Sequence, residues 1–279
     1  MNQLAAADAY CKLLTRSHYE NFSVASGFLP LRVRLDLMRI YAYCRTTDDL
    51  GDESGSAAMQ RLERWRGEVA ALFAGEAPVH PVLVALHETV AAHAFTAEPF
   101  LDLIEANARD QRDATYESWA QLEEYCMLSA APVGRMVLRV FGLSGPLIER
   151  LSDDVCIGLQ LANHAQDVRR DAGIGRTYLV QPDIRAQGIA GAVRALCARA
   201  RTLLAAGVEL EAMAPFALRA QLSLYRLGGQ AICDAVEAID FRTDLHRPRV
   251  SSSKKVELVL RALIQALRPS ATVRDASAV

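Results

Sequence analysis

The spacing of apolar residues constrains the fold of this chain more than any other feature. In residues 31–50, apolar side chains recur three or four positions apart at Leu31, Leu35, Met38 and Ala42, which is the period of an α-helix. Similar helical patterns run through residues 57–74, 80–94, 99–109, 117–141, 147–171, 187–206, 216–243 and 254–267. Alternating patterns of convincing length for strands are absent. The sequence therefore predicts an all-α fold.

The predicted helices are separated by short segments rich in glycine, proline and serine, such as Gly75 to Pro81 and Gly142 to Pro146. No change in composition marks a domain boundary, and no repeat of fixed period is visible. Hydrophobic residues make up 51% of the chain, enough for a sizeable core. We expect one helical domain over residues 1–267, followed by a polar tail over residues 268–279.

The overall charge excludes some classes of partner. A net charge of −2 and a pI near 6.3 argue against a nucleic-acid partner. The six cysteines form no CxxC pair, so we expect free thiols rather than a zinc site. No secretory signal or spanning stretch is apparent, which predicts a cytoplasmic protein. Peripheral membrane contact remains open, although the mildly basic stretch 194–201 is interpreted as a solvated helix face.

A first row of carboxylates lies near the end of the predicted helix at 31–50. Asp48 and Asp52 are four residues apart and share a face, with Asp49 beside them, and Tyr41 and Arg45 extend the same stripe. These carboxylates repel one another and the negative end of the helix dipole. Magnesium, which prefers oxygen ligands, would relieve this repulsion. Taken alone, the row also fits a solvated acidic helix end.

A second polar row follows in the predicted helix at 147–171. Asn163, Asp167 and Asp171 are each four residues apart, and Gln160 precedes Asn163 by three. Alone, this row also fits ordinary surface residues paired with neighbouring arginines. Two such rows on separate helices, facing each other across a cavity, would hold several magnesium ions around a diphosphate and help it to leave.

The loop after the second row adds two candidate diphosphate ligands. Its sequence, from Gly173 to Leu179, contains Arg176, which would bind diphosphate through two parallel hydrogen bonds, and Tyr178, which would donate another. The alternative is a glycine-capped helix end with an exposed arginine. Arg45 has the same two interpretations, as an ion-pair partner of the first row or as a phosphate clamp.

Together, the two rows and the Gly-Arg-x-Tyr-Leu loop resemble the squalene/phytoene synthase family. The segments at 19–26 and 125–135, the latter containing Ser-Ala-Ala-Pro-Val-Gly-Arg, are most similar to the bacterial hydroxysqualene synthase branch. The resemblance implies the isoprenoid synthase fold, with helices around a central cavity. One departure is Arg170, which stands where many relatives carry an acidic residue just before the last aspartate, here Asp171.

The resemblance also implies roles for individual residues. The expected magnesium ligands are Asp48, Asp49, Asp52, Asn163, Asp167 and Asp171. The expected diphosphate ligands are Arg45, Arg176 and Tyr178, and the expected cavity residues are Phe22, Tyr41, Tyr125 and Gln160. Catalysis would depend most directly on Asp48, Asp52, Asp167, Tyr41 and Arg45. Core packing is an equally good interpretation of Phe22, Tyr41 and Tyr125.

The implied substrate is a prenyl diphosphate, most specifically presqualene diphosphate. Magnesium-dependent loss of diphosphate, rearrangement of the cation and capture of water would give hydroxysqualene, and no NADPH is expected. A first alternative is the head-to-head joining of two prenyl diphosphates to give presqualene diphosphate, squalene or phytoene. A second is a non-catalytic scaffold member of the family, although such a protein would be expected to lose carboxylates that this chain keeps. The sequence does not indicate an oligomeric state.

Overall fold

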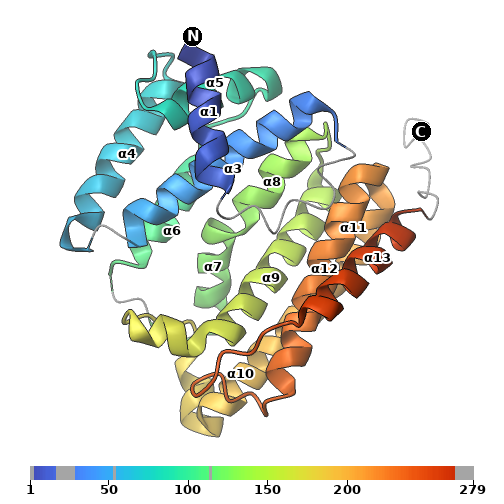
Figure 1. The fold of residues 1–279 in the computed structure, drawn as a ribbon. Coiled ribbons are helices and arrows are strands. Elements are labelled where there is room, and N and C mark those ends of the chain that lie inside the picture. The colour runs from blue at the N-terminus through green and yellow to red at the C-terminus, as the bar shows by residue number, and fades with distance from the viewer. Residues whose placement is uncertain (1–2, 17–28, 53–54, 113–114, 268–279) are drawn as a thin grey trace, which may run out of the picture. The chain divides into compact units, whose positions relative to one another are not determined.

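The structure is a computed structural model that describes residues 3–16, 29–52, 55–112 and 115–267 (Figure 1). Its helices are α1 (Gln3–Arg16), α3 (Leu31–Asp52), the 3-10 helix η2 (Gly55–Ala57), α4 (Ala58–Phe73), α5 (Pro81–His93), α6 (Glu98–Arg109), α7 (Trp119–Ser129), α8 (Ala131–Val140), α9 (Pro146–Gly173), α10 (Gln181–Ala205), α11 (Gly207–Met213), α12 (Phe216–Glu237) and α13 (Ser252–Ala266). The described residues contain no strand, only an isolated bridge between Tyr116 and Val180. The all-α prediction is therefore confirmed.

Three helix boundaries differ from the sequence prediction by more than two residues. The predicted helix at 117–141 is two helices, α7 and α8, because Pro132 opens α8 and the backbone at Ala130 leaves the helical region. Helix α10 begins at Gln181 and bends at Gly188, whose φ of 70° is easily adopted only by glycine. Helix α12 ends at Glu237 rather than at 243. Helices α1 and α11 were not predicted.

The chain folds into two compact units, and each is described by itself. Unit 1 comprises residues 1–114 and 127–144, and unit 2 comprises residues 115–126 and 145–279. The predicted boundary between a domain at 1–267 and a tail stays a prediction, since the structure does not describe residues 268–279. All six cysteines are free thiols, as expected. No helix among the described residues is both long and apolar enough to cross a bilayer.

Helix α3 is central in unit 1, where it packs against α1, α4, α5, α6 and α8. The Tyr43 hydroxyl donates a hydrogen bond to the carbonyl of Phe100 at 2.7 Å, and its ring stacks on Trp65 with 5.8 Å between centroids. The Trp65 indole donates to the Thr47 hydroxyl at 3.0 Å. These buried contacts fix the rotation of α3, and therefore the direction in which its C-terminal half presents the first row.

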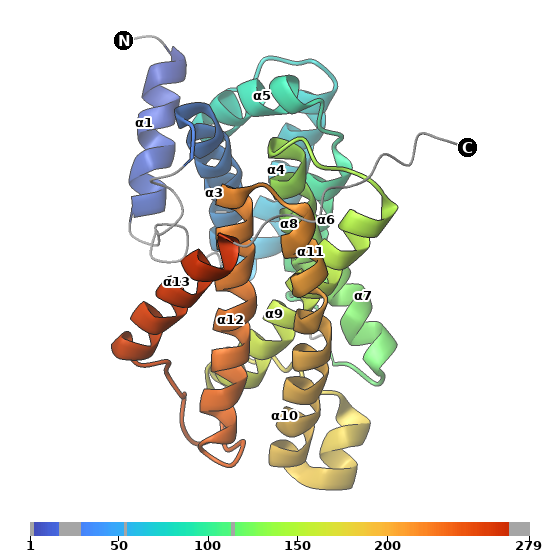
Figure 2. The same cartoon turned by 90° about the vertical axis from the view of Figure 1, so that its right-hand side faces the viewer.

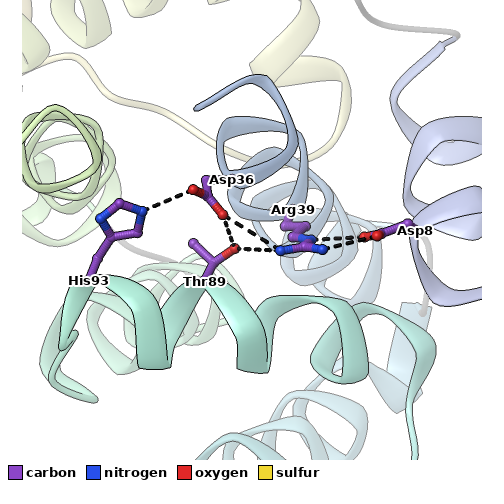
Figure 3. A network of polar contacts seen from close by, with 5 residues as sticks. All are labelled: Asp8, Asp36, Arg39, Thr89 and His93. Atoms are coloured by element: carbon purple, nitrogen blue, oxygen red, sulfur yellow. Dashed lines mark hydrogen bonds and ion pairs between the residues drawn. The ribbon is translucent and has the colours of Figure 1, made fainter. Parts of the chain in front are cut away.

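A polar network ties α1 and α5 to the N-terminal half of α3 (Figure 3). The Arg39 guanidinium donates to both carboxylate oxygens of Asp8, at 2.8 and 2.9 Å. Thr89 donates to Asp36 at 2.8 Å, and a ring nitrogen of His93 lies 2.9 Å from the other oxygen of Asp36. Because Asp36 and Arg39 are buried, removal of either partner would leave an uncompensated charge, at a cost of about 3–5 kcal/mol.

Unit 2 is built on α9, which packs against α10, α11 and α12, while α13 lies against α12 (Figure 2). Two glycines allow this close packing. A Cβ at Gly158 would lie 3.1 Å from the backbone of both Ala200 and Leu204, and one at Gly229 would lie 2.8 Å from the Leu204 side chain. The close approach of α9 and α10 holds the second polar row on a rigid support.

Candidate active site

The first row lies at the end of α3, where α6 comes closest. The side-chain amide of Asn107 donates to Asp48 at 3.2 Å, and that of Gln111 donates to the Gly51 carbonyl at 3.0 Å. Gly51 makes this approach possible, because a Cβ there would lie 2.6 Å from the Asn107 amide oxygen. Two amides, one on α6 and one in the turn after it, therefore position the row, and sequence reasoning missed both. The sequence pattern did not indicate them, because they lie in a segment without an acidic motif.

The electrostatics of the first row are those of crowded carboxylates. Desolvation by the surrounding protein raises the pKa of Asp48 to about 6, the hydrogen bond from Asn107 opposes this shift, and the charge of Asp52 adds to it. Asp48 is nevertheless exposed to solvent. Arg45 forms an ion pair with Asp49, one turn away. A carboxyl that is difficult to ionise, but within reach of solvent, would gain from a nearby cation.

Tyr41 lies one turn before Arg45 on α3 and is partly buried. Burial raises the pKa of the Tyr41 hydroxyl, with Arg45 opposing the shift, so the hydroxyl keeps its proton near neutral pH. The structure thus shows Arg45 in its ion-pair role. The Arg45 side chain is also 30% exposed, so it is accessible to a phosphate group.

The second row lies along the C-terminal half of α9, where two arginines contact the carboxylate of Asp167. Arg247 donates to both oxygens of Asp167, and Arg170 approaches one of them at 3.5 Å. Arg247 reaches this position because the segment after α12 runs along α9, where Gln166 donates to the Pro248 carbonyl at 2.9 Å. Sequence reasoning missed Arg247, which lies 80 residues from Asp167 in a segment without periodicity.

The loop after α9 turns back on the helix end. Gly175 adopts a φ of 76°, and the backbone N–H of Arg176 donates to the Asp171 carbonyl at 2.8 Å. This turn places the Arg176 backbone against the last residue of the second row. Two residues later, Tyr178 is 8% exposed and belongs to the interior of unit 2.

Tyr178 is part of a group of four aromatic rings, called here the aromatic cluster, which also contains Tyr116, Tyr125 and His164. His164 stacks on Tyr178 with 3.8 Å between ring centroids and 21° between planes. The ring centroid of Tyr125 lies 5.3 Å from that of Tyr178 and 5.7 Å from that of Tyr116. The cluster joins α7, α9 and the two segments that meet at the bridge between Tyr116 and Val180.

His164 sits in the second row, between Asn163 and Asp167. Burial lowers the pKa of its imidazole to about 3, so it is neutral at pH 7. Its Nε2 is buried and makes no hydrogen bond within the described part of the chain. Helical spacing does not indicate the stacked rings around this histidine. Those rings come from residues 14 to 48 positions away, a separation that helical periodicity does not report.

The predicted site residues fall into two groups. Tyr41, Arg45 and the three aspartates of the first row belong to unit 1, whereas Tyr125, Gln160, the second row, Arg176 and Tyr178 belong to unit 2. Phe22 lies outside the described residues. Across residues 3–16, 29–52, 55–112 and 115–267, no three His, Cys, Asp or Glu side chains converge in a way that would hold an ion. The magnesium ligands therefore stay a prediction.

Comparison with known proteins defines the class first and then the family. The all-α architecture is that of the isoprenoid synthase fold, and the chain is similar over 85% of its length to a solved structure, the squalene synthase HpnC from Alicyclobacillus acidocaldarius. The two share 42% sequence identity with a TM-score of 0.79, and the match covers 95% of that structure. Residues 15–255 match the family model for squalene/phytoene synthase. The chain belongs to the squalene/phytoene synthase family.

Two curated relatives represent different branches of this family. The chain is 30% identical over 291 residues to phytoene synthase 3 of Zea mays, a match covering 95% of the chain and 67% of the relative. It is 35% identical over 167 residues to a hydroxysqualene synthase of Zymomonas mobilis, covering 59% of the chain and 56% of that enzyme. The matches thus span between about half and two thirds of these relatives, and they include both branches.

Proposed function

We propose that this protein is a hydroxysqualene synthase, which ionises presqualene diphosphate in a magnesium-dependent reaction and captures the rearranged cation with water. The observation that carries the proposal is the position of the aromatic cluster. The neutral ring of His164, stacked on Tyr178, lies in sequence between two members of the second row. Such an arrangement combines polar groups for a diphosphate with uncharged rings for a cation.

The two rows would hold the magnesium ions. Their members offer carboxylate and amide oxygens, the ligands that magnesium prefers. The raised pKa of Asp48 fits this role, because desolvation and the charge of Asp52 disfavour the ionised carboxylate, which a bound cation would favour. When bound, magnesium would neutralise the diphosphate and make it a better leaving group.

Three arginines would bind and orient the diphosphate: Arg45, Arg176 and Arg247. Arg247 is engaged by Asp167 in the structure. A dication on Asp167 would compete for the same carboxylate oxygens and leave the Arg247 guanidinium available for phosphate oxygens. The Asp167–Arg247 pair would then act as a placeholder that holds both groups in position before substrate binds.

The aromatic cluster would protect and stabilise the cation once the carbon–oxygen bond to diphosphate breaks. Each aromatic face stabilises a desolvated cation by about 1–2 kcal/mol. His164 contributes only if it is uncharged, and burial keeps it so, since the pKa of its imidazole is lowered to about 3. The rings would also exclude bulk water, which would otherwise end the rearrangement early.

Capture of one water completes the proposed reaction. The water oxygen donates an electron pair to the rearranged cation, a carbon–oxygen bond forms, and the oxonium proton passes to the released diphosphate. The step requires no hydride donor, in agreement with the expectation that NADPH is not used. Support comes from the 42% identity to the Alicyclobacillus structure and the 35% identity to the Zymomonas enzyme.

A second candidate is the head-to-head joining of two prenyl diphosphates. It is favoured by one observation, the match to a maize phytoene synthase along 95% of the chain, which is longer than the match to the hydroxysqualene synthase. The same two rows would serve either reaction, because both begin with loss of diphosphate.

The test is incubation of the purified full-length protein with magnesium and presqualene diphosphate, without NADPH, followed by product analysis. Hydroxysqualene is the expected product. Activity only with farnesyl or geranylgeranyl diphosphate would favour the second candidate. No turnover of any of these substrates would leave the scaffold alternative.

Variants of the rows test the mechanism in the same assay. Asp48→Asn and Asp167→Asn should each abolish turnover with helicity unchanged. Asp244→Asn is a matched control, because Asp244 forms an exposed ion pair with Arg242 outside both rows. Full activity in Asp48→Asn or Asp167→Asn would remove that row from the mechanism.

A further inference from the structure

Helix α13 carries two apolar faces, and only one of them is covered. Leu258, Ala262 and Ala266 recur every four residues and are buried against α12. Four other apolar side chains lie on a different face and are widely exposed: Val256 at 61%, Leu260 at 55%, Ile264 at 63% and Leu267 at 73%. These four residues are called here the outer stripe.

The outer stripe is continuous. Its members are spaced by four, four and three residues, so at 3.6 residues per turn they line up along one side of the helix. Single exposed apolar residues are common on protein surfaces, whereas a row of four on one helix marks a contact surface. The stripe runs from position 256 to 267 and is therefore about 17 Å long, at a rise of 1.5 Å per residue.

The surroundings of the stripe are basic. Residues 242–267 contain six lysines and arginines against two acidic residues, whereas the whole chain has a net charge of −2. Arg249 is exposed just before α13, and Arg261 is 50% exposed beside the stripe, where it pairs with Glu257 at 3.4 Å. The segment is therefore a positive region on a weakly acidic protein, and it complements an anionic surface.

The area of the stripe argues against a second protein chain as the partner. A face about 17 Å long and about 10 Å wide offers on the order of 170 Å², well below the roughly 800 Å² that each partner contributes to a standard protein interface. An apolar face flanked by basic residues, on a helix too polar to span a bilayer, is instead the pattern of a helix that lies in the plane of a membrane surface.

We propose that α13 docks this protein on an anionic lipid bilayer, with the outer stripe in the acyl boundary and Arg249 and Arg261 at the headgroups. The basic amphipathic helix is thus α13, and not the stretch at 194–201. In that stretch Leu196, Cys197 and Ala200 are buried, so it presents no large apolar side chain to a bilayer. The proposal does not depend on which reaction the protein catalyses.

The test is flotation of the full-length protein with vesicles of phosphatidylcholine alone or mixed with phosphatidylglycerol. The wild-type protein should float with the mixed vesicles. The double variant Leu260→Ser with Ile264→Ser should bind them at least about tenfold more weakly, because two large apolar side chains no longer enter the bilayer. Arg249→Glu should weaken binding to mixed vesicles by about fivefold or more.

A matched control removes equally exposed apolar side chains elsewhere. Val79 and Leu13 are 89% and 65% exposed and lie in unit 1, so Val79→Ser with Leu13→Ser should bind vesicles as the wild type does. Because every substituted residue is exposed, circular dichroism and turnover of a detergent-dispersed substrate should not change.

Three results would overturn the proposal. The first is wild-type protein that stays with neither kind of vesicle. The second is equal loss of binding in the control and outer-stripe variants. The third is a concentration-dependent dimer, seen by light scattering, that the outer-stripe variant alone abolishes, since the stripe would then be covered by a second copy.

Discussion

The stability of unit 2 should depend on pH through His164. Burial lowers the pKa of its imidazole to about 3, whereas an unfolded histidine titrates near 6.5. Below about pH 6.5 the unfolded chain therefore binds a proton that the folded chain does not, so stability falls as the pH falls. The contribution is fully present above pH 6.5 and is lost progressively toward pH 3.

The size of the effect follows from one proton. A difference of one bound proton changes the free energy of unfolding by about 1.36 kcal/mol per pH unit. Between pH 7 and pH 5 the term integrates to about 2 kcal/mol for a group that titrates near 6.5 only when unfolded. His164→Phe keeps a flat ring on Tyr178 but has no proton to bind, so it should lack this term.

The assay is urea unfolding of the wild type and His164→Phe at pH 7 and pH 5. The wild type should lose about 2 kcal/mol more than the variant over this interval, whatever the variant's stability at pH 7. The exposed His246 supplies the control, because His246→Gln should follow the wild type at both values. Equal pH dependence in wild type and His164→Phe would refute the assignment of a buried neutral imidazole.

Two further substitutions test the packing on which the site rests. Gly51→Ala should reduce turnover strongly and cost about 1 kcal/mol of stability, because the new Cβ would displace Asn107 and remove its solvent-exposed hydrogen bond to Asp48. Steady-state kinetics would show this, and unchanged turnover would mean that Asn107 is not needed. Glu211→Gln should lower the free energy of unfolding by about 3–5 kcal/mol, because the buried charge of Arg226 would lose its carboxylate partner. The exposed Glu257→Gln should cost less than about 1 kcal/mol in the same urea titration, and equal costs would contradict the assignment of a buried ion pair.

Local chemistry made most of the fold predictable. The helix at 31–50 was found within two residues because its apolar period is regular, and it continues through Gly51 to Asp52. The helix at 117–141 was drawn as one because its apolar period continues through Ala130. The weak signal, Pro132, is compatible with a helix interior kink as well as a new first turn. The seven-residue α11 is too short for a period to be counted.

The site was predictable only in part, for a physical reason. The members of each row lie within a few residues of one another, so helical spacing reveals them. Arg247 and Asn107 reach the rows through tertiary packing, from positions 80 and 59 residues away. No periodicity in a single sequence encodes such a meeting. The ring cluster around His164 was missed for the same reason, although each of its tyrosines is visible in the sequence.

One measurement addresses the magnesium assignment most directly: a crystal structure with manganese in place of magnesium and a non-cleavable thio analogue of the prenyl diphosphate. We expect anomalous peaks within about 2.0–2.2 Å of oxygens from both Asp48 and Asp167, with one diphosphate between the ions. Manganese bound elsewhere, or a diphosphate held without metal contacts from either aspartate, would contradict the proposed chemistry.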